Sequence, residues 1–378
     1  MIIVLLTGCW DAINIEDRGF VVGISVDMDD KVTEGHYNLS VTNQIIVPGG
    51  YGTPEKGAGE KRAVTNVTAT GESMIAITRK MARKTSRAPF YEHLKVIIIS
   101  EEIAKEPNLI ASLLDLFIRD HEMRRGIKVL IADGKAKDIL AHEPKAEIYP
   151  VKYITAITEH NDKNIEIIDP VKIGKLHGYL LEKSSFILPR ALFTGKGMDE
   201  SGVAVFHGND NKMVGVLNND ETKGLNLIKQ GNKTGVITFD VDNHLMAFEI
   251  EGTKSKIRMD TKDPKNIGIS IKVKAEGQIA EMFGSRSLLD PKYMSEIEKQ
   301  VARKIEQLIK QTIEKSQKDL KTDVFGFGEM LKQKHFKVWK KVENNWDHGE
   351  NYFEKSNITV SADVEVRAIG STDKAKHH

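Results

Sequence analysis

Hydrophobic and polar residues alternate most regularly near the C-terminus. Over residues 358–366, hydrophobic side chains occupy every second position and hydroxyl or charged side chains fill the positions between them. The same period of two runs through residues 267–273. Because successive side chains of a strand point to opposite faces, this pattern predicts half-buried strands of an antiparallel sheet. Two further strands are expected at 235–241 and 244–251, joined by the turn sequence VDNH.

A helical spacing replaces the alternation after residue 290. Asp290 and Pro291 are residue types that begin helices, as N-cap and first-turn residue. The narrow stripe that follows consists of Met294, Ile297, Val301, Ile305, Leu308 and Thr312. It predicts a helix about 45 Å long that runs to about Lys321 and packs on the sheet. A second helix is expected over 323–346, after a glycine-marked break.

Residues 201–229 lead into this part of the chain. The pattern predicts a strand, a turn of Asn and Asp residues, a second strand, and a helix opened by Asn219, Asp220 and Glu221. We therefore expect a C-terminal α+β domain at 201–370, in which long helices cover an antiparallel sheet. The polar tail at 371–378 is predicted to be disordered.

The N-terminal part begins with two strands rich in β-branched residues. They are predicted at 18–27 and 36–46, as a hairpin that turns through Asp29, Asp30 and Gly35. The next stretch, VPGGYGTPEKGAGEKR, is rich in glycine and has no hydrophobic period. It is therefore predicted to be a loop.

Helices and strands then alternate. The continuous apolar runs LKVIIIS and GIKVLIAD are typical of strands buried on both faces. Helical spacing appears from Glu72, on both sides of Pro107, and after the second run. This alternation predicts an α/β layered domain over 9–148. The segment 149–200, with two helical stretches, is either a small middle domain or an extension of the first. The fold class is thus α+β with several domains.

Length and composition bound the function. The chain has 378 residues, 40% hydrophobic and 29% charged, which suits two or three globular domains. It contains no run of about eighteen apolar residues of the kind that spans a bilayer. A net charge of +1 gives no overall attraction to nucleic acid or acidic lipid. A partner must therefore be recognised by something other than total charge.

Cys9 is the only cysteine, which excludes an intramolecular disulfide framework. It is a buried core thiol, a nucleophile or a lipid attachment point. The small residues Thr7 and Gly8 follow the apolar run Ile2 to Leu6, as at the end of a bacterial lipoprotein signal sequence. This favours the attachment point, with residues 1–8 as the remnant of a signal peptide. No basic region precedes the run, so we expect the complete signal peptide to begin further upstream.

Motifs that would carry catalysis, metal binding or phosphate binding are incomplete. The glycine-rich stretches lack the spacing of phosphate loops, and the sequence after His121 and Glu122 lacks the second histidine of a zinc helix. The acidic stretch from Val26 has Val32 where a calcium loop needs glycine. We therefore expect no catalytic residues, no cofactor and no metal site.

Two charged segments are candidate contact surfaces. The stretch FIRDHEMRR ends a predicted helix and includes Arg119 and Asp120, which are expected to form a local ion pair. It is either a solvated face or a partner-binding face. The stretch KQKHFKVWKKVENNW mixes lysines with aromatic residues, as nucleic-acid or membrane-binding segments do. Its helical spacing at Leu331, Val338 and Val342 favours a helix with one face in the core.

Several stretches, in the same order along the chain, resemble the Ger(x)C family of bacterial spore-germination lipoproteins. The resemblance is carried by GCWDAINIEDRGFVVGISVD, YEHLKVIIISEEIAKE, LDLFIRDHEMRR, GKAKDIL, GVAVFHGNDNKMVGVLNNDETKGLNLI and DVFGFGEMLKQKHFKVWKKVENNW. Together they span nearly the whole chain, and the segment 149–198 matches least.

The resemblance implies a location and a role. Cleavage between Gly8 and Cys9 would leave Cys9 as the first residue, with a diacylglyceryl group on its sulfur. The protein is then a non-enzymatic C subunit of a nutrient germinant receptor, on the outer face of the spore inner membrane. Its implied partners are the membrane lipid and the integral-membrane A and B subunits, with no nucleic acid. An alternative is a lipid-anchored solute-binding protein that captures the germinant directly, which would need a deep cleft between domains.

Overall fold

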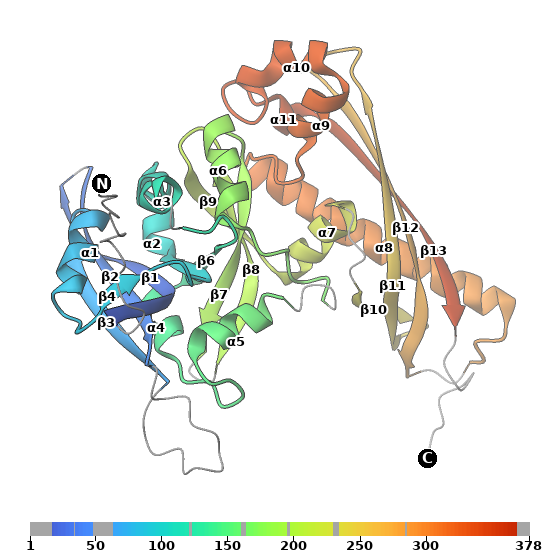
Figure 1. Cartoon of the computed structure of the whole chain (residues 1–378). Coiled ribbons are helices and arrows are strands. Elements are labelled where there is room, and N and C mark those ends of the chain that lie inside the picture. The colour runs from blue at the N-terminus through green and yellow to red at the C-terminus, as the bar shows by residue number, and fades with distance from the viewer. Residues whose placement is uncertain are drawn as a thin grey trace, which may run out of the picture.

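A computed structural model of the chain contains two β-sheets with helices on and between them (Figure 1). The structure describes residues 17–33, 35–47, 63–120, 123–159, 164–194, 197–229, 234–283 and 286–368. The first sheet has nine strands and the second has four. The predicted fold class is confirmed: an α/β N-terminal part precedes a C-terminal sheet packed with long helices.

The nine-stranded sheet is parallel in its centre and antiparallel at both sides. Parallel pairs join β1 to β5, β5 to β6 and β6 to β7, and β4 also pairs with β1 in parallel. Hairpins extend the sheet to β3 on one side and to β9 on the other. The strands are β1 (Arg18–Thr33), β2 (His36–Ile46), β3 (Val64–Gly71), β4 (Ala88–Phe90), β5 (Val96–Ser100), β6 (Lys128–Asp133), β7 (Phe186–Phe193), β8 (Met198–His207) and β9 (Lys212–Leu217).

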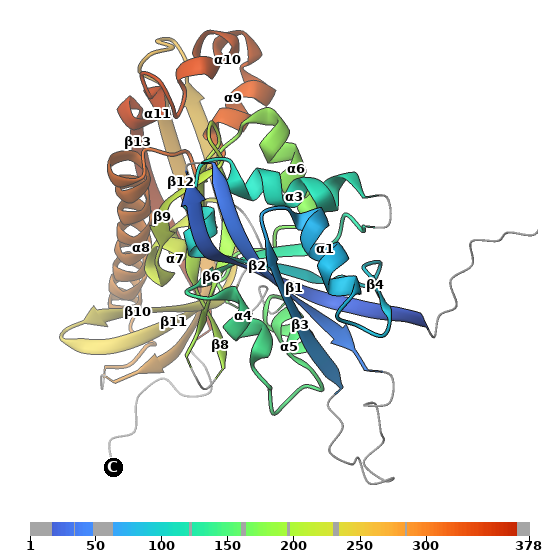
Figure 2. The same ribbon diagram turned by 90° about the vertical axis from the view of Figure 1, so that its left-hand side faces the viewer.

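Helices cover both faces of this sheet, which explains the continuous apolar runs of its central strands (Figure 2). Ile97 and Ile99 of β5 pack on one face with the first group of helices, and Val96 and Ile98 pack on the other face with the second group. The first group is α1 (Met74–Ala82), α2 (Glu101–Ala104), α3 (Leu109–Arg119) and α6 (Ile173–Glu182), and the second is α4 (Ala136–Ala141) and α5 (Pro150–Ile157). The helix break expected at Pro107 separates α2 from α3.

The segment 149–200 belongs to the nine-stranded sheet. It contains α5, α6 and β7, and β7 pairs with β6 before it and with β8 after it. Strand pairing therefore crosses both boundaries proposed from the sequence, at 148 and at 200. The division of the chain into domains stays a prediction, but these boundaries do not separate one sheet from the other.

The second sheet has the order β10 (Gly235–Val241), β11 (His244–Asp260), β12 (Gly268–Met282) and β13 (Asn357–Ala368). The first three strands are antiparallel, with the predicted turn at Asp242 and Asn243 in the left-handed region. The prediction of an antiparallel sheet is wrong for β13, which pairs with β12 in parallel. The long helical connection after β12 returns the chain to the opposite end of the sheet, as a parallel pair requires.

The C-terminal helices are α7 (Asn219–Lys229), α8 (Pro291–Glu314), α9 (Phe327–Lys334), α10 (Phe336–Val342) and α11 (Tyr352–Lys355). Asp290 caps α8 by accepting from the Lys292 N–H, as its position predicts. The prediction of a single helix over 323–346 is wrong, because the helix breaks at His335. The N–H of His335 closes α9 on Leu331, and its carbonyl opens α10 by accepting from Val338 and Trp339.

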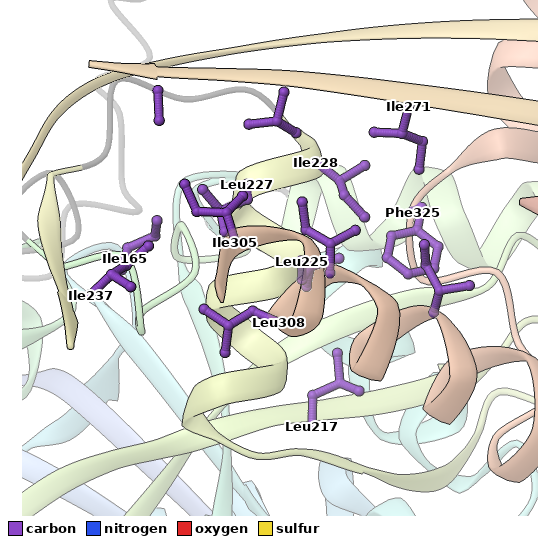
Figure 3. Packing of buried hydrophobic residues seen from close by; sticks show 14 of the residues in the cluster. Ile165, Leu217, Leu225, Leu227, Ile228, Ile237, Ile271, Ile305, Leu308 and Phe325 are labelled. Atoms are coloured by element: carbon purple, nitrogen blue, oxygen red, sulfur yellow. The ribbon is translucent and has the colours of Figure 1, made fainter. Parts of the chain in front are cut away.

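One hydrophobic core joins the two sheets. Val203 of β8 and Leu217 of β9 belong to the same buried cluster as Ile271 of β12. Figure 3 shows α7 inside this cluster, with Leu225, Leu227 and Ile228 among residues of α8, β9 and β12. The cluster takes residues from both sides of position 200, so the N-terminal and C-terminal parts share a core.

Candidate functional site

A groove of about 920 Å³ lies on the N-terminal part of the molecule, beside α3. Three segments line it: the start of β2, residues 72–75 at the start of α1, and residues 107–120. The stretch FIRDHEMRR, a candidate partner-binding face in the sequence, contributes Arg119 and Asp120 to this lining. His121 and Glu122 lie outside the described residues. A smaller hollow of about 210 Å³ lies at the end of α3, next to α6.

The groove combines an apolar lining with a polar rim. Leu39, Met74, Leu109 and Leu113 line it and are themselves buried, whereas Ile75 is 53% exposed. Such a mixture is typical of surfaces that bind other proteins, where an apolar centre is surrounded by polar groups. Neither hollow lies between the two sheets. The solute-binding alternative would need a deep cleft between domains.

Several polar side chains of the groove have partners among the described residues. The Tyr37 hydroxyl donates to Oε2 of Glu106 at 2.9 Å. The sequence predicts an ion pair of Arg119 with Asp120, but the guanidinium pairs with Asp115, one helical turn earlier, at 2.7 Å. The hydrogen bond that the Arg119 guanidinium donates to this carboxylate raises the pKa of Arg119.

A second polar cluster joins the C-terminal helices to the nine-stranded sheet. Oδ2 of Asp347 accepts from the Ser185 hydroxyl at 2.6 Å, just before β7. The backbone carbonyl of Asp347 contacts Nε2 of His207, at the end of β8, at 2.9 Å. The Asp347 side chain is 12% exposed and lies 3.3 Å from Nδ1 of His348. Burial acts to raise the pKa of Asp347, but the bonds from His348 and Ser185 and the nearby His207 hold it below its ordinary value.

The neighbouring Asp323 organises the start of α9. Its Oδ1 accepts from the backbone N–H groups of Phe325 and Gly326, and its Oδ2 accepts from the N–H of Gly328 at 2.7 Å and from Nε1 of Trp346 at 2.8 Å. Burial raises the pKa of Asp323, although the bonds from Gly328 and Trp346 act in the opposite direction. These bonds attach the turn before α9 to the segment after α10.

The sequence alone does not identify these polar contacts of Asp347 and Asp323. Ser185, His207, Asp323 and Asp347 come from separate segments, and each is an ordinary polar residue in its local pattern. The aromatic stretch 332–346 is better predicted, because Val342 and Trp346 are buried in the shared core. Phe336 differs from that expectation, since it is 55% exposed.

The predicted lipid attachment site, Cys9, and the cleavage position at Gly8 lie outside the described residues. Within the described part of the chain, no cluster of three or more His, Cys, Asp or Glu side chains is arranged to hold a metal ion. The helices described here include none with the length and apolar character needed to cross a membrane.

The fold is that of an α+β protein with two sheets, and comparison with known proteins identifies the family. Residues 11–191 match the family described as "Spore germination protein N-terminal domain", and residues 201–370 match "Spore germination B3/ GerAC like, C-terminal". The chain belongs to this GerAC-like family of spore germination proteins, as the resemblance in its sequence indicates.

Individual relatives match over nearly their whole lengths. The chain is 31% identical to spore germination protein YndF of Bacillus subtilis, covering 98% of this chain and 95% of the relative. It is 28% identical to spore germination protein B3 of the same organism, covering 98% and 96%. The crystal structure of the GerBC protein has the same fold, with a TM-score of 0.63 and 23% identity over 91% of this chain and 97% of that one.

Proposed function

We propose that this chain is a lipid-anchored, non-enzymatic subunit of a nutrient germinant receptor in the spore inner membrane. The observation that carries the proposal is the similarity of 98% of the chain to a spore germination protein at 31% identity. In this proposal Cys9 becomes the first residue after cleavage behind Gly8 and carries a diacylglyceryl group on its sulfur. The protein faces outward from the membrane and acts through contacts with the integral-membrane A and B subunits.

The proposed anchor is adequate on physical grounds. Each buried CH₂ group of an acyl chain contributes about 0.8 kcal/mol, and one chain alone gives only reversible attachment. A diacylglyceryl group supplies two chains on one residue. Cys9 is the only residue of the chain with a thiol to carry it.

The anchor is tested by replacing Cys9 with alanine in a gene that carries the complete signal sequence. The variant should leave the membrane fraction of spores and should lack acyl mass on its N-terminal peptide. A control, Thr7→Ser, keeps the small residue before the cleavage position and should stay acylated. Fusing Cys9→Ala to a transmembrane helix should restore membrane attachment and germination. Full membrane retention of Cys9→Ala without the fusion would contradict the anchor.

The groove beside α3 supports the contact part of the proposal. Its buried leucines and charged rim suit an amphipathic segment of another protein. Leu116 lines the groove and is only partly buried, so Leu116→Glu should leave the fold intact and reduce co-purification with the A and B subunits. Ile148→Glu is the control, because Ile148 is 55% exposed and is not part of the groove lining. Equal co-purification of both variants would contradict the groove as the contact surface for these subunits.

A second candidate function is direct capture of the germinant. It is favoured by the volume of the groove, about 920 Å³, which lies within the range of small-molecule sites. Calorimetric titration of the purified chain with amino acids and sugars separates the two functions. The contact function predicts no saturable heat, whereas tight binding that is lost in Leu116→Glu would favour the capture function.

A further inference from the structure

The outer face of the second sheet carries a block of positive charge, most of which has no ion pair among the described residues. On β11 and β12 (Figure 1), buried and exposed residues alternate, so one face packs in the shared core and the other faces solvent. The exposed face places five cations next to one another: Lys254, Lys256 and Arg258 on β11, and Lys272 and Lys274 on β12.

The strand register sets these cations directly against each other. Lys256 lies opposite Lys272, and Lys254 lies opposite Lys274. Like charges at directly opposed positions of a sheet destabilise it. Among the described residues, only Lys274 of the five has a carboxylate within ion-pair distance, Asp363 at 3.8 Å. The remaining four have no ion pair within the described part of the chain.

The overall composition of the chain does not account for this block of positive charge. It has 55 basic and 54 acidic residues, so a face with five neighbouring cations departs from the average. The neighbouring strand β13 has no such excess of positive charge, since its exposed residues include the acidic Asp363 and Glu365. The repulsion between Lys256 and Lys272 is relieved when an anionic group lies between them.

We propose that this face binds an extended acidic segment of another protein. Alternate residues of a strand are about 7 Å apart, so Lys254, Lys256 and Arg258 form a row about 14 Å long. Carboxylates at every second residue of an extended segment have the same spacing and would meet the row in register. The proposal rests on the proposed function, because it specifies the chemistry of one protein partner.

The acidic strand beside the block favours a narrow partner over a membrane surface. Asp363 lies opposite Lys274, and Glu365 lies opposite Glu276, in the parallel register of β12 and β13. A flat anionic bilayer that covered the lysines would also bring its negative charges close to these carboxylates. The electrostatic repulsion between them costs free energy. A single segment along β11 and β12 contacts the cations and leaves β13 in water.

The experiment uses the purified full chain and a fluorescent peptide of alternating glutamate and threonine, with a glutamine–threonine peptide as the uncharged control. The double variant Lys256→Gln/Lys272→Gln should weaken binding of the acidic peptide about fivefold at low salt, as the loss of two exposed ion contacts predicts. Binding should also fall as salt is raised. The matched control is Lys292→Gln/Lys299→Gln, which removes the same charge from exposed positions of α8 and should bind like the parent chain.

Two outcomes would overturn the proposal. The first is equal peptide binding by the double variant and the α8 control. The second is an absence of peptide binding together with sedimentation on vesicles that contain phosphatidylglycerol, lost in the Lys256→Gln/Lys272→Gln variant, which would assign the face to lipid. Because the chain is studied in solution without an acyl group, neither outcome bears on the anchor at Cys9.

Discussion

At the residue scale, the buried carboxylate of Asp323 accepts hydrogen bonds from three backbone N–H groups and from Nε1 of Trp346. Asparagine in its place would keep one acceptor oxygen and turn an NH₂ group toward N–H donors that Asp323 now satisfies. We expect Asp323→Asn to lower the free energy of unfolding by about 2–3 kcal/mol, the cost of unsatisfied buried groups. Urea unfolding measures the loss. Trp346→Phe removes one donor and also part of a buried ring, so its cost combines a lost hydrogen bond with lost packing. A loss below about 0.5 kcal/mol in Asp323→Asn would contradict this role.

The lowered pKa of Asp347 predicts a dependence of stability on pH. Its folded-state pKa lies below the ordinary value of 3.8, so the stabilisation is complete above pH 3.8 and is lost as pH falls through the lowered pKa. Asp347→Asn should therefore be less stable than the parent chain at neutral pH, by about 1–2 kcal/mol. The difference should shrink below pH 3.8 in urea titrations at several pH values. Ser185→Ala keeps the carboxylate and should retain most of this pH dependence.

At the element scale, a glycine sets the distance between α7 and α8. A Cβ atom at Gly224 would lie 2.1 Å from Oγ1 of Thr312 and 2.5 Å from the backbone oxygen of Leu308. Because backbone cannot move aside cheaply, Gly224→Ala should destabilise the protein by about 1–3 kcal/mol. Gly178 of α6 is the matched control, since a Cβ there meets nothing within 4 Å. Gly178→Ala should stabilise by about 0.5–1 kcal/mol through helix propensity, and equal effects of the two changes would contradict the argument.

The opposed lysines of β11 and β12 predict a stabilising substitution. Lys272→Glu places a carboxylate opposite Lys256 and replaces repulsion with attraction. The free energy of unfolding should rise by about 0.5–1 kcal/mol at low salt, and the gain should decrease at high salt. In a Lys256→Gln background the same change should give little gain. A gain that is unchanged by salt or by that background would show that charge is not its cause.

The elements themselves are largely predictable from local pattern, and the relations between them are not. The alternation in residues 358–366 identifies β13, and Asp290 with Pro291 identifies the start of α8. The parallel direction of β13 depends on where a connection of more than seventy residues ends, which no local period encodes. The break at His335 likewise depends on backbone hydrogen bonds that the helical spacing around it does not reveal.

At the scale of the whole molecule, the sequence indicates two units and the packing joins them. The change of pattern near residue 200 coincides with the gap between the two family matches, at 191 and 201. Strand β8 nevertheless pairs with β7 across this position. The hydrogen bond between Asp347 and Ser185 and the hydrophobic core around α7 also connect the two parts of the chain. A boundary in sequence patterns is therefore not a boundary in packing here.

This arrangement predicts that a fragment cut at residue 200 will not fold properly. Residues 201–370 alone would carry most of β8 and all of β9 without β7, and would expose Ala204 and Phe206, which are fully buried against N-terminal helices and strands in the whole chain. At about 25 cal/mol per Å² of apolar surface, several such side chains cost more than a domain of this size can lose. Nuclear magnetic resonance spectra of the fragment should show poor dispersion. A fragment from 218 to 370, which leaves β8 and β9 out, is the comparison; its α7 would lack Leu217 and the strands beneath it, so it should also be less stable than the full chain. Well-dispersed spectra from the fragment 201–370 would instead mean that the core around α7 closes without the nine-stranded sheet.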